Sequence, residues 1–222
     1  MNAQPDPQRR LRSVLFALTV VSGTIDAVSF LALGHVFTAN MTGNIVFLAF
    51  AVAGVPGLSV FRSGLALVAF LAGAAIGGRM GVAYAAGPEA RWPAIPFAIE
   101  AGLLLLAALA AIGLGPAGSQ IVIALTAVAM GIRNATVRKL AIPDLTTTVL
   151  TLTLTGIAAD SSIAGGENPR LKQRALAVVS MFAGAGVGAL VVRTSIVAAL
   201  LACSLVAAAG AVATSRFHSA KI

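Results

Sequence analysis

Long apolar runs separated by few charges constrain this chain more than any other feature. They recur from Ser13 to Thr214, and of the 222 residues 59% are hydrophobic while only 10% are charged. A water-soluble domain needs a polar surface that this composition cannot supply. The runs are also continuous rather than alternating, which disfavours a membrane β-barrel. The sequence therefore predicts an all-α polytopic membrane protein.

Two of the apolar runs are unusual. Eight runs can be drawn in all, at residues 13–33, 36–55, 63–86, 94–115, 118–140, 144–160, 172–192 and 195–214. The second opens within the polar stretch HVFTANMTGN, which begins at His35, and the sixth is short and rich in threonine. A helix needs about 20 apolar residues to span a bilayer. We therefore expect six spanning helices plus two re-entrant or broken segments.

The distribution of Lys and Arg favours six crossings. If all eight runs crossed, the 15 basic residues would divide 9 against 6 between the two sides of the membrane. With six crossings they divide 13 against 2, and only Arg62 and Arg193 lie on the poorer side. Because cytoplasmic loops carry an excess of basic residues, we expect both termini, including a tail at residues 1–12, to be cytoplasmic. The formal net charge of +8 is explained in the same way, so no nucleic-acid partner is expected.

Three motifs recur in the same order in the two halves of the chain. They are Gly23-x-x-Asp26-Ala27 with Gly131-x-x-Asn134-Ala135, Thr38-x-x-Met41-Thr42-Gly43 with Thr151-x-x-Leu154-Thr155-Gly156, and AGAAIGG from Ala72 with AGAGVGA from Ala183. We expect one membrane domain over residues 1–222, built of two repeats at 13–115 and 118–214. Because each repeat would contribute three crossings, an odd number, the second repeat would be inverted relative to the first.

The two unusual segments occupy matching positions in the repeats, which is typical of a transport site. Non-helical backbone is tolerated at membrane depth only where protein buries it or where it lines a wet cavity. The stretch LTLTLT from Leu150 alternates with period two and fits a short extended piece; alternatively, Thr148, Thr151 and Thr155 share one face of a helix and bond back to its carbonyls. The candidate substrate- or ion-binding residues are Asp26, Asn40, Thr42, Gly43, Asn44, Asn134, Thr151 and Thr155.

Acidic side chains within the apolar runs need a partner or a use. Asp26 lies near the middle of the first run, where a carboxylate costs about 2.5–3.5 kcal/mol. It either couples to protons or locks the two halves together, with Arg133 as its partner. Glu100 is a second proton-relay candidate; alternatively, it neutralises Arg79 or Arg91. Asp160, beside a polar loop, is expected to be solvated or to cap a helix.

Small residues form seams that recur in both halves. Gly73 and Gly77, and likewise Gly184 and Gly188, would let helices approach closely, either within one chain or between copies in a homo-oligomer. The single cysteine, Cys203, cannot form an internal disulfide. No metal-binding or nucleotide-binding motif is present, so we expect no metal, no cofactor and no enzymatic activity.

Two stretches of the chain resemble a known group of proteins. SGTIDAVSFLALGHVFTANMTGNIVFL from Ser22 and MGIRNATVRKLAIPDLTTTVLTLTLTG from Met130 are similar to the signature regions of the bacterial YoaK-like family. The first stretch contains Asp26 and the HVFTANMTGN segment, and the second contains Asn134 and the threonine-rich segment. The resemblance implies six spanning helices and a bacterial plasma membrane, and it implies no substrate.

Two functions fit these features. The first is a small-solute transporter or channel in which the two polar segments meet at the bilayer midplane, helix N-termini favour an anion or a carboxylate, and Asp26 couples transport to protons. The alternative is a non-transporting membrane scaffold or assembly protein whose polar residues only pack helices. Water-accessible polar groups that continue from one face to the midplane would favour transport, and a dry, fully paired interior would favour the scaffold.

Overall fold

The computed structural model describes residues 7–85, 93–113, 116–141 and 150–215. Within these ranges the chain is helical and has no strand. The helices are α1 (Pro7–Ala32), α2 (Met41–Val52), α3 (Val60–Ala85), α4 (Ala94–Ile112), α5 (Pro116–Leu140), α6 (Leu150–Ala159), α7 (Leu171–Val192) and α8 (Ile196–Ser215), with a 3-10 turn, η1, at Ser162–Ala164.

Six of the eight helices are long and apolar enough to cross a membrane, namely α1, α3, α4, α5, α7 and α8. The other two, α2 and α6, have 12 and 10 residues. At 1.5 Å per residue they reach about 18 and 15 Å, well short of the roughly 30 Å hydrocarbon core. The prediction of six spanning helices and two short segments is confirmed.

One local prediction needs correction. The stretch from Leu150 to Thr155 is helical rather than extended, and the Thr155 hydroxyl donates to the Thr151 carbonyl at 2.9 Å, as the helical alternative requires. Thr148 lies outside the described residues. α1 begins at Pro7, so the second half of the predicted cytoplasmic tail, residues 1–12, is already helical.

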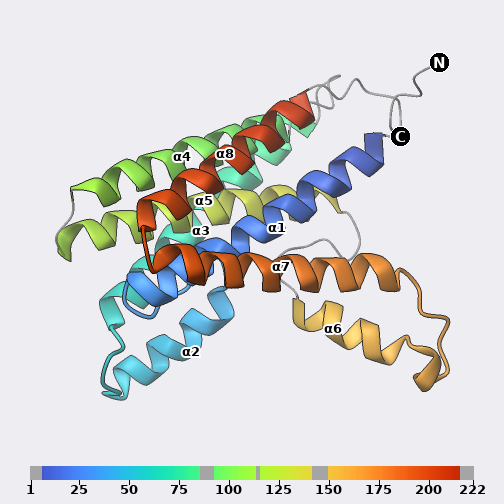
Figure 1. The fold of residues 1–222 in the computed structure, drawn as a ribbon, viewed down its shortest axis with the longest axis horizontal. Coiled ribbons are helices and arrows are strands. Elements are labelled where there is room, and N and C mark those ends of the chain that lie inside the picture. Colours follow the sequence, from blue (N-terminus) through green and yellow to red (C-terminus); the bar gives the residue numbers. More distant parts are fainter. Residues whose placement is uncertain (1–6, 86–92, 114–115, 142–149, 216–222) are drawn as a thin grey trace.

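The spanning helices pack in pairs, α1 with α7, α3 with α5 and α4 with α8. The short helices lie beside this bundle, α2 against α3 and α6 against α7. Figure 1 shows that α2 and α6 both begin toward the middle of the molecule and then run apart to opposite ends. Each short segment therefore ends at the same end of the molecule as the long helix that precedes it.

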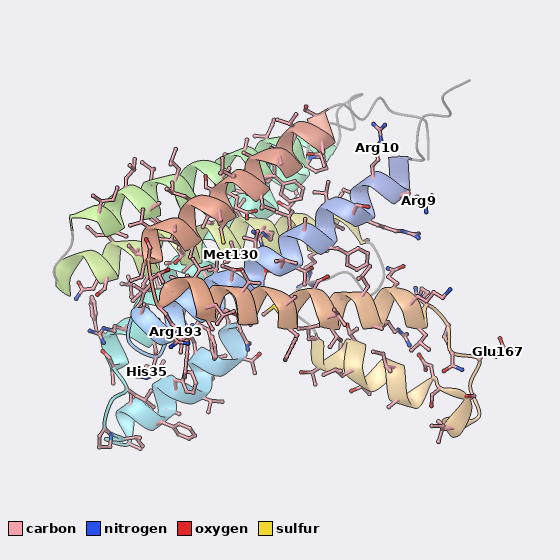
Figure 2. The ribbon with its side chains drawn as sticks, viewed as in Figure 1. Arg9, Arg10, His35, Met130, Glu167 and Arg193 are labelled. Carbon is pink, nitrogen blue, oxygen red and sulfur yellow. The ribbon has the colours of Figure 1, made fainter. Side chains whose placement is uncertain are left out.

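The charged ends of the molecule agree with the six-crossing arrangement. Figure 2 shows Arg9, Arg10 and Glu167 toward one end, and His35 and Arg193 toward the other. Arg62 belongs to the second end, because its side chain packs against Gly34 beside His35. Gly34 has a φ of 97°, a left-handed conformation that suits glycine and turns the chain at the end of α1.

The glycine seams are used within the chain. A Cβ at Gly73 or Gly77 would collide with the α5 backbone, and a Cβ at Gly184 or Gly188 would collide with the α1 backbone. These four glycines therefore allow close packing of α3 on α5 and of α7 on α1. A homo-oligomer through the same residues stays a prediction.

The two seams use residues that the motif comparison places at matching positions. Gly23 of α1 and Gly131 of α5 occupy the same position in the matched motifs, and each is in close contact with a partner helix. The contacts of Gly23 are Met181, Gly184 and Ala185, and those of Gly131 are their counterparts 111 residues earlier, Phe70, Gly73 and Ala74. The first helix of each half thus packs against the second spanning helix of the other half, α1 on α7 and α5 on α3.

Candidate solute site

Asp26 holds the connection between α1 and α2 in place. Its Oδ1 accepts hydrogen bonds from the backbone N–H groups of Thr38, at 3.2 Å, and Ala39, at 2.9 Å. The carboxylate is buried, with 5% of the residue exposed. Buried backbone donors need partners, so this carboxylate satisfies two N–H groups that neither helix could use.

Asn44 fixes the same connection from the side of α2. Its Oδ1 accepts from the Phe37 N–H at 2.8 Å, and its Nδ2 donates to the Phe37 carbonyl. The Phe37 ring packs on both Phe30 of α1 and Phe47 of α2, with centroid separations of 5.2 and 5.5 Å, and the three rings form one cluster. Gly43 makes room for the Phe37 ring, because a Cβ there would lie 2.7 Å from it. The polar stretch therefore forms a loop that is held in one conformation by hydrogen bonds and ring packing.

Two adjoining cavities lie beside this loop. The inner cavity has a volume of about 390 Å³ and the outer cavity about 810 Å³. They share Ala39, Asn40, Thr42 and Asn134 in their linings. The inner cavity is also lined by Ser22, Asp26, Gly43, Val46, Phe47, Leu150, Thr151 and Met181, and the outer by Met41, Phe70, Ala74, Gly78, Ala135, Arg138 and Lys139. Both volumes fall in the range of small-molecule sites.

Six of the eight predicted binding residues line these cavities. They are Asp26, Asn40, Thr42, Gly43, Asn134 and Thr151. Asn44 instead braces the loop through Phe37, and Thr155 is turned into its own helix through the Thr151 carbonyl. The first turns of α2 and α6 line one cavity together, although the residues are more than 100 positions apart in the chain.

The first turn of α2 has no side-chain cap. Asn40 occupies the N-cap position, yet its side chain makes no capping hydrogen bond. An uncapped N-terminus leaves backbone N–H groups without an intrahelical partner and carries a partial positive charge. Because Asn40 lines both cavities, its amide and the adjacent helix end are available to a solute.

Glu100 and Arg133 form an ion pair in the core, and neither residue is exposed. The Arg133 Nε donates to Glu100 Oε2 at 2.9 Å, and Nη2 donates to Oε1. Nη1 donates to the Leu18 carbonyl at 2.5 Å and to the Ser22 hydroxyl at 2.8 Å. Two predicted pairings need correction: Arg133 pairs with Glu100 rather than with Asp26, and Glu100 pairs with Arg133 rather than with Arg79. Arg91, the other predicted partner of Glu100, lies outside the described residues. Glu100 lines neither cavity.

Asp160 is half-exposed, in line with the expectation of a solvated side chain, and it also forms an ion pair that the sequence did not predict. Its Oδ2 accepts from Arg174 Nη1 at 2.7 Å, and the same nitrogen donates to the Gly156 carbonyl at 2.6 Å. Arg174 of α7 thereby satisfies a carbonyl near the end of α6 and ties the two helices together. Asp160 is part of an ion pair that secures the far end of the short helix.

The sequence reasoning missed four polar or flexible lining residues. Arg138 and Lys139 were taken only as topology signals, and Ser22 and Met181 were not singled out. Arg138 lies four residues after Asn134, and that spacing places both on one face of a helix. Among the described residues, no three His, Cys, Asp or Glu side chains come together as a group that could hold a metal ion.

Comparisons with known proteins give two similarities. Residues 14–213 match a family described as "Protein of unknown function (DUF1275)". The chain is 35% identical over 153 residues to the UPF0700 transmembrane protein YoaK of Bacillus subtilis (strain 168), covering 68% of this chain and 67% of that protein. No solved structure matches the chain.

Proposed function

The chain belongs to the DUF1275 family of YoaK-like proteins, and from the geometry of its cavities we propose that it is a small-solute transporter or channel. It would act in the bacterial plasma membrane, with both termini in the cytoplasm. The observation that carries the proposal is the polar lining that continues from Asp26, through Asn40 and Asn134, to Arg138 and Lys139. We propose no catalytic role, and no cofactor enters the mechanism.

The cost of irregular backbone in a membrane supports this proposal. Each unsatisfied backbone group in hydrocarbon costs several kcal/mol. Part of that cost is met here by Asp26 and Asn44, which bond the loop. Asn40, Thr42 and Thr151 remain exposed at the starts of the short helices. A wet cavity would solvate them, and a passing solute would meet them.

An inverted repeat is part of the proposal. The matched contacts of Gly23 with α7 and of Gly131 with α3 support a two-fold relation between the halves. With three spanning helices in each half, that axis would lie in the membrane plane. The short helices would then enter from opposite sides and meet at the midplane, where the substrate would bind.

We also propose that Asp26 couples transport to protons. Its oxygen binds the loop that carries Asn40, so a change in its charge would alter how firmly that loop is held. The charged side chain that acts on Asp26 from a neighbouring helix is Arg133 of α5, which is paired with Glu100 of α4. Transport by Asp26→Asn is expected to lose its dependence on pH while the protein stays folded.

The alternative, a membrane scaffold or assembly protein, is favoured by one observation. Glu100 and Arg133, the most deeply buried charges among the described residues, are fully engaged in packing α4, α5 and α1. A scaffold would use every polar group in this way. A scaffold, however, does not require the cavities beside Asn40 and Asn134.

Reconstitution in liposomes tests the proposal. Purified protein is incorporated into vesicles, and the flux of a panel of small anions, cations and neutral solutes is compared with that of protein-free vesicles. Asn40→Leu and Thr151→Leu should abolish the protein-dependent flux, because both residues line the inner cavity. Thr155→Leu is the matched control: it also replaces an exposed polar residue of a short helix by leucine, outside both cavities.

The outcome separates the two functions. Flux that disappears in Asn40→Leu and Thr151→Leu but persists in Thr155→Leu supports transport through the cavities. Equal flux in all three variants would place the pathway elsewhere. Absence of protein-dependent flux for every solute would leave the scaffold as the better explanation.

A further inference from the structure

We infer that the solute carried by this protein is a small anion. This inference rests on the proposed transport function and specifies its substrate class. It starts from the charges along the outer cavity. Arg138 and Lys139, in the last turn of α5, both line it, and none of its described lining residues is acidic. A cleft lined by one sign of charge concentrates ions of the opposite sign.

The acid of the inner cavity does not reverse this preference. Asp26 directs Oδ1 at the N–H groups of Thr38 and Ala39, so part of its charge is balanced by the peptide dipoles of the loop. A metal cation such as K⁺ needs several oxygen ligands. Asp26 is the only carboxylate among the described residues that line either cavity, and it is already committed to the loop.

The neutral lining groups can bind an anion through their hydrogen-bond donors. Asn40 can donate through its amide, and Thr42 and Thr151 through their hydroxyls. The uncapped start of α2 lies beside the same space and adds backbone donors. An anion would thus pass from two basic side chains to a set of uncharged donors, without meeting an exposed carboxylate on the way.

Flux measurements with matched probes test this inference on the full chain in liposomes. Chloride, nitrate and lactate serve as anions, K⁺ as the cation, and lactamide as the neutral analogue of lactate. The lactate/lactamide pair differs mainly in charge, so its flux ratio reports the effect of charge at nearly constant size. We expect lactate to exceed lactamide by about tenfold or more.

Three double variants test whether Arg138 and Lys139 are responsible for the anion preference. Arg138→Gln with Lys139→Gln should lower anion flux by about tenfold or more, and Arg138→Lys with Lys139→Arg should restore it. Arg9→Gln with Arg10→Gln is the matched control: it removes two exposed basic residues that line neither cavity. Thermal unfolding in detergent checks that each variant is folded.

Each result decides one of two questions. Faster flux of lactamide or K⁺ than of the anions would overturn the anion inference while leaving transport intact. So would equal anion flux in the Arg138/Lys139 and Arg9/Arg10 glutamine variants. No protein-dependent flux for any probe would overturn the transport proposal itself, and the inference with it.

Discussion

At the scale of single residues, the loss of one partner of the Glu100–Arg133 pair is expected to have the greatest effect on stability. Both groups are fully buried, and the guanidinium also bonds the Leu18 carbonyl and Ser22. Burying two charges costs several kcal/mol each, and their attraction repays this only with good geometry and further hydrogen bonds. The pair therefore adds little net stability, but either partner alone would be very costly.

This reasoning predicts the behaviour of two variants. Glu100→Gln leaves Arg133 charged and unpaired, so the free energy of unfolding should fall by about 3–5 kcal/mol. Replacing both residues at once, with Glu100→Leu and Arg133→Met, should cost less than the single change. Thermal unfolding in detergent measures both, with Glu167→Gln, in the exposed loop after η1, as the control. A single variant as stable as the control would contradict the argument.

Asp26 gives a second prediction at this scale. Asp26→Ala would leave the N–H groups of Thr38 and Ala39 without their acceptor, at about 1–3 kcal/mol for each buried donor. Asp26→Asn keeps an acceptor oxygen in the same position, so its thermal unfolding should stay close to that of the native protein. Equal loss of stability in the two variants would show that the negative charge matters more than the hydrogen bonds.

From the sequence, polar residues of the candidate site were easier to predict than the hydrogen-bond and ion-pair partners of buried charges. Asp26, Asn40 and Thr42 stood out because polar groups in an apolar run need a reason to be there. The pairing of Glu100 with Arg133 could not be predicted, because it depends on how α4 and α5 are rotated against each other. Sequence spacing gives the face of one helix, and packing decides what that face meets.

At the scale of elements, the lengths of the apolar runs and the positions of the small residues were informative about the helices and their packing. The short runs became α2 and α6 because neither contains enough apolar residues to span. The alternating LTLTLT stretch was ambiguous, since period two also fits a strand. The structure resolves this ambiguity as a helix, in which the Thr155 hydroxyl donates to the Thr151 carbonyl.

The glycine seams predict a contrast between two neighbouring sites of α7. Gly184→Ala would push a methyl group into the α1 backbone at Val20, and overpacking of this kind costs about 1–3 kcal/mol. Gly186→Ala meets nothing within 4 Å and should be neutral or stabilising by up to about 1 kcal/mol, because alanine favours helix. The thermal unfolding temperature should therefore fall in Gly184→Ala and stay the same or rise in Gly186→Ala. A destabilised Gly186→Ala would mean that another surface covers this face.

At the scale of the whole molecule, two general rules predicted most of the arrangement. The charge asymmetry selected six crossings, and the length of the apolar runs identified the two short segments. What neither rule could give is the packing of α1 on α7 and of α3 on α5, because that exchange between the halves depends on which glycine seams fit together. The cavity lining was predictable only in part for the same reason: Arg138 and Lys139 reach it through the packing of α5.

The last prediction concerns the sidedness of the loops. Single cysteines are introduced at Val55, Gly113, Ala141 and Glu167 in a Cys203→Ala background, which removes the only native cysteine. With six crossings and cytoplasmic termini, the cysteines at 55 and 113 should react with an impermeant thiol reagent in whole cells. Those at 141 and 167 should react only after the membrane is permeabilised.

The same four sites discriminate against eight crossings. If α2 and α6 also crossed, positions 55 and 113 would become cytoplasmic and position 141 would become external, while position 167 would not change sides. Glu167→Cys is therefore the internal control for permeabilisation. Because Arg62 and Arg193 lie at the end of the molecule opposite Arg9 and Arg10, the positive-inside rule assigns that end to the outside. Labelling of position 141 in intact cells would refute the six-crossing arrangement. Labelling of position 167 there would instead reverse the orientation of the whole protein.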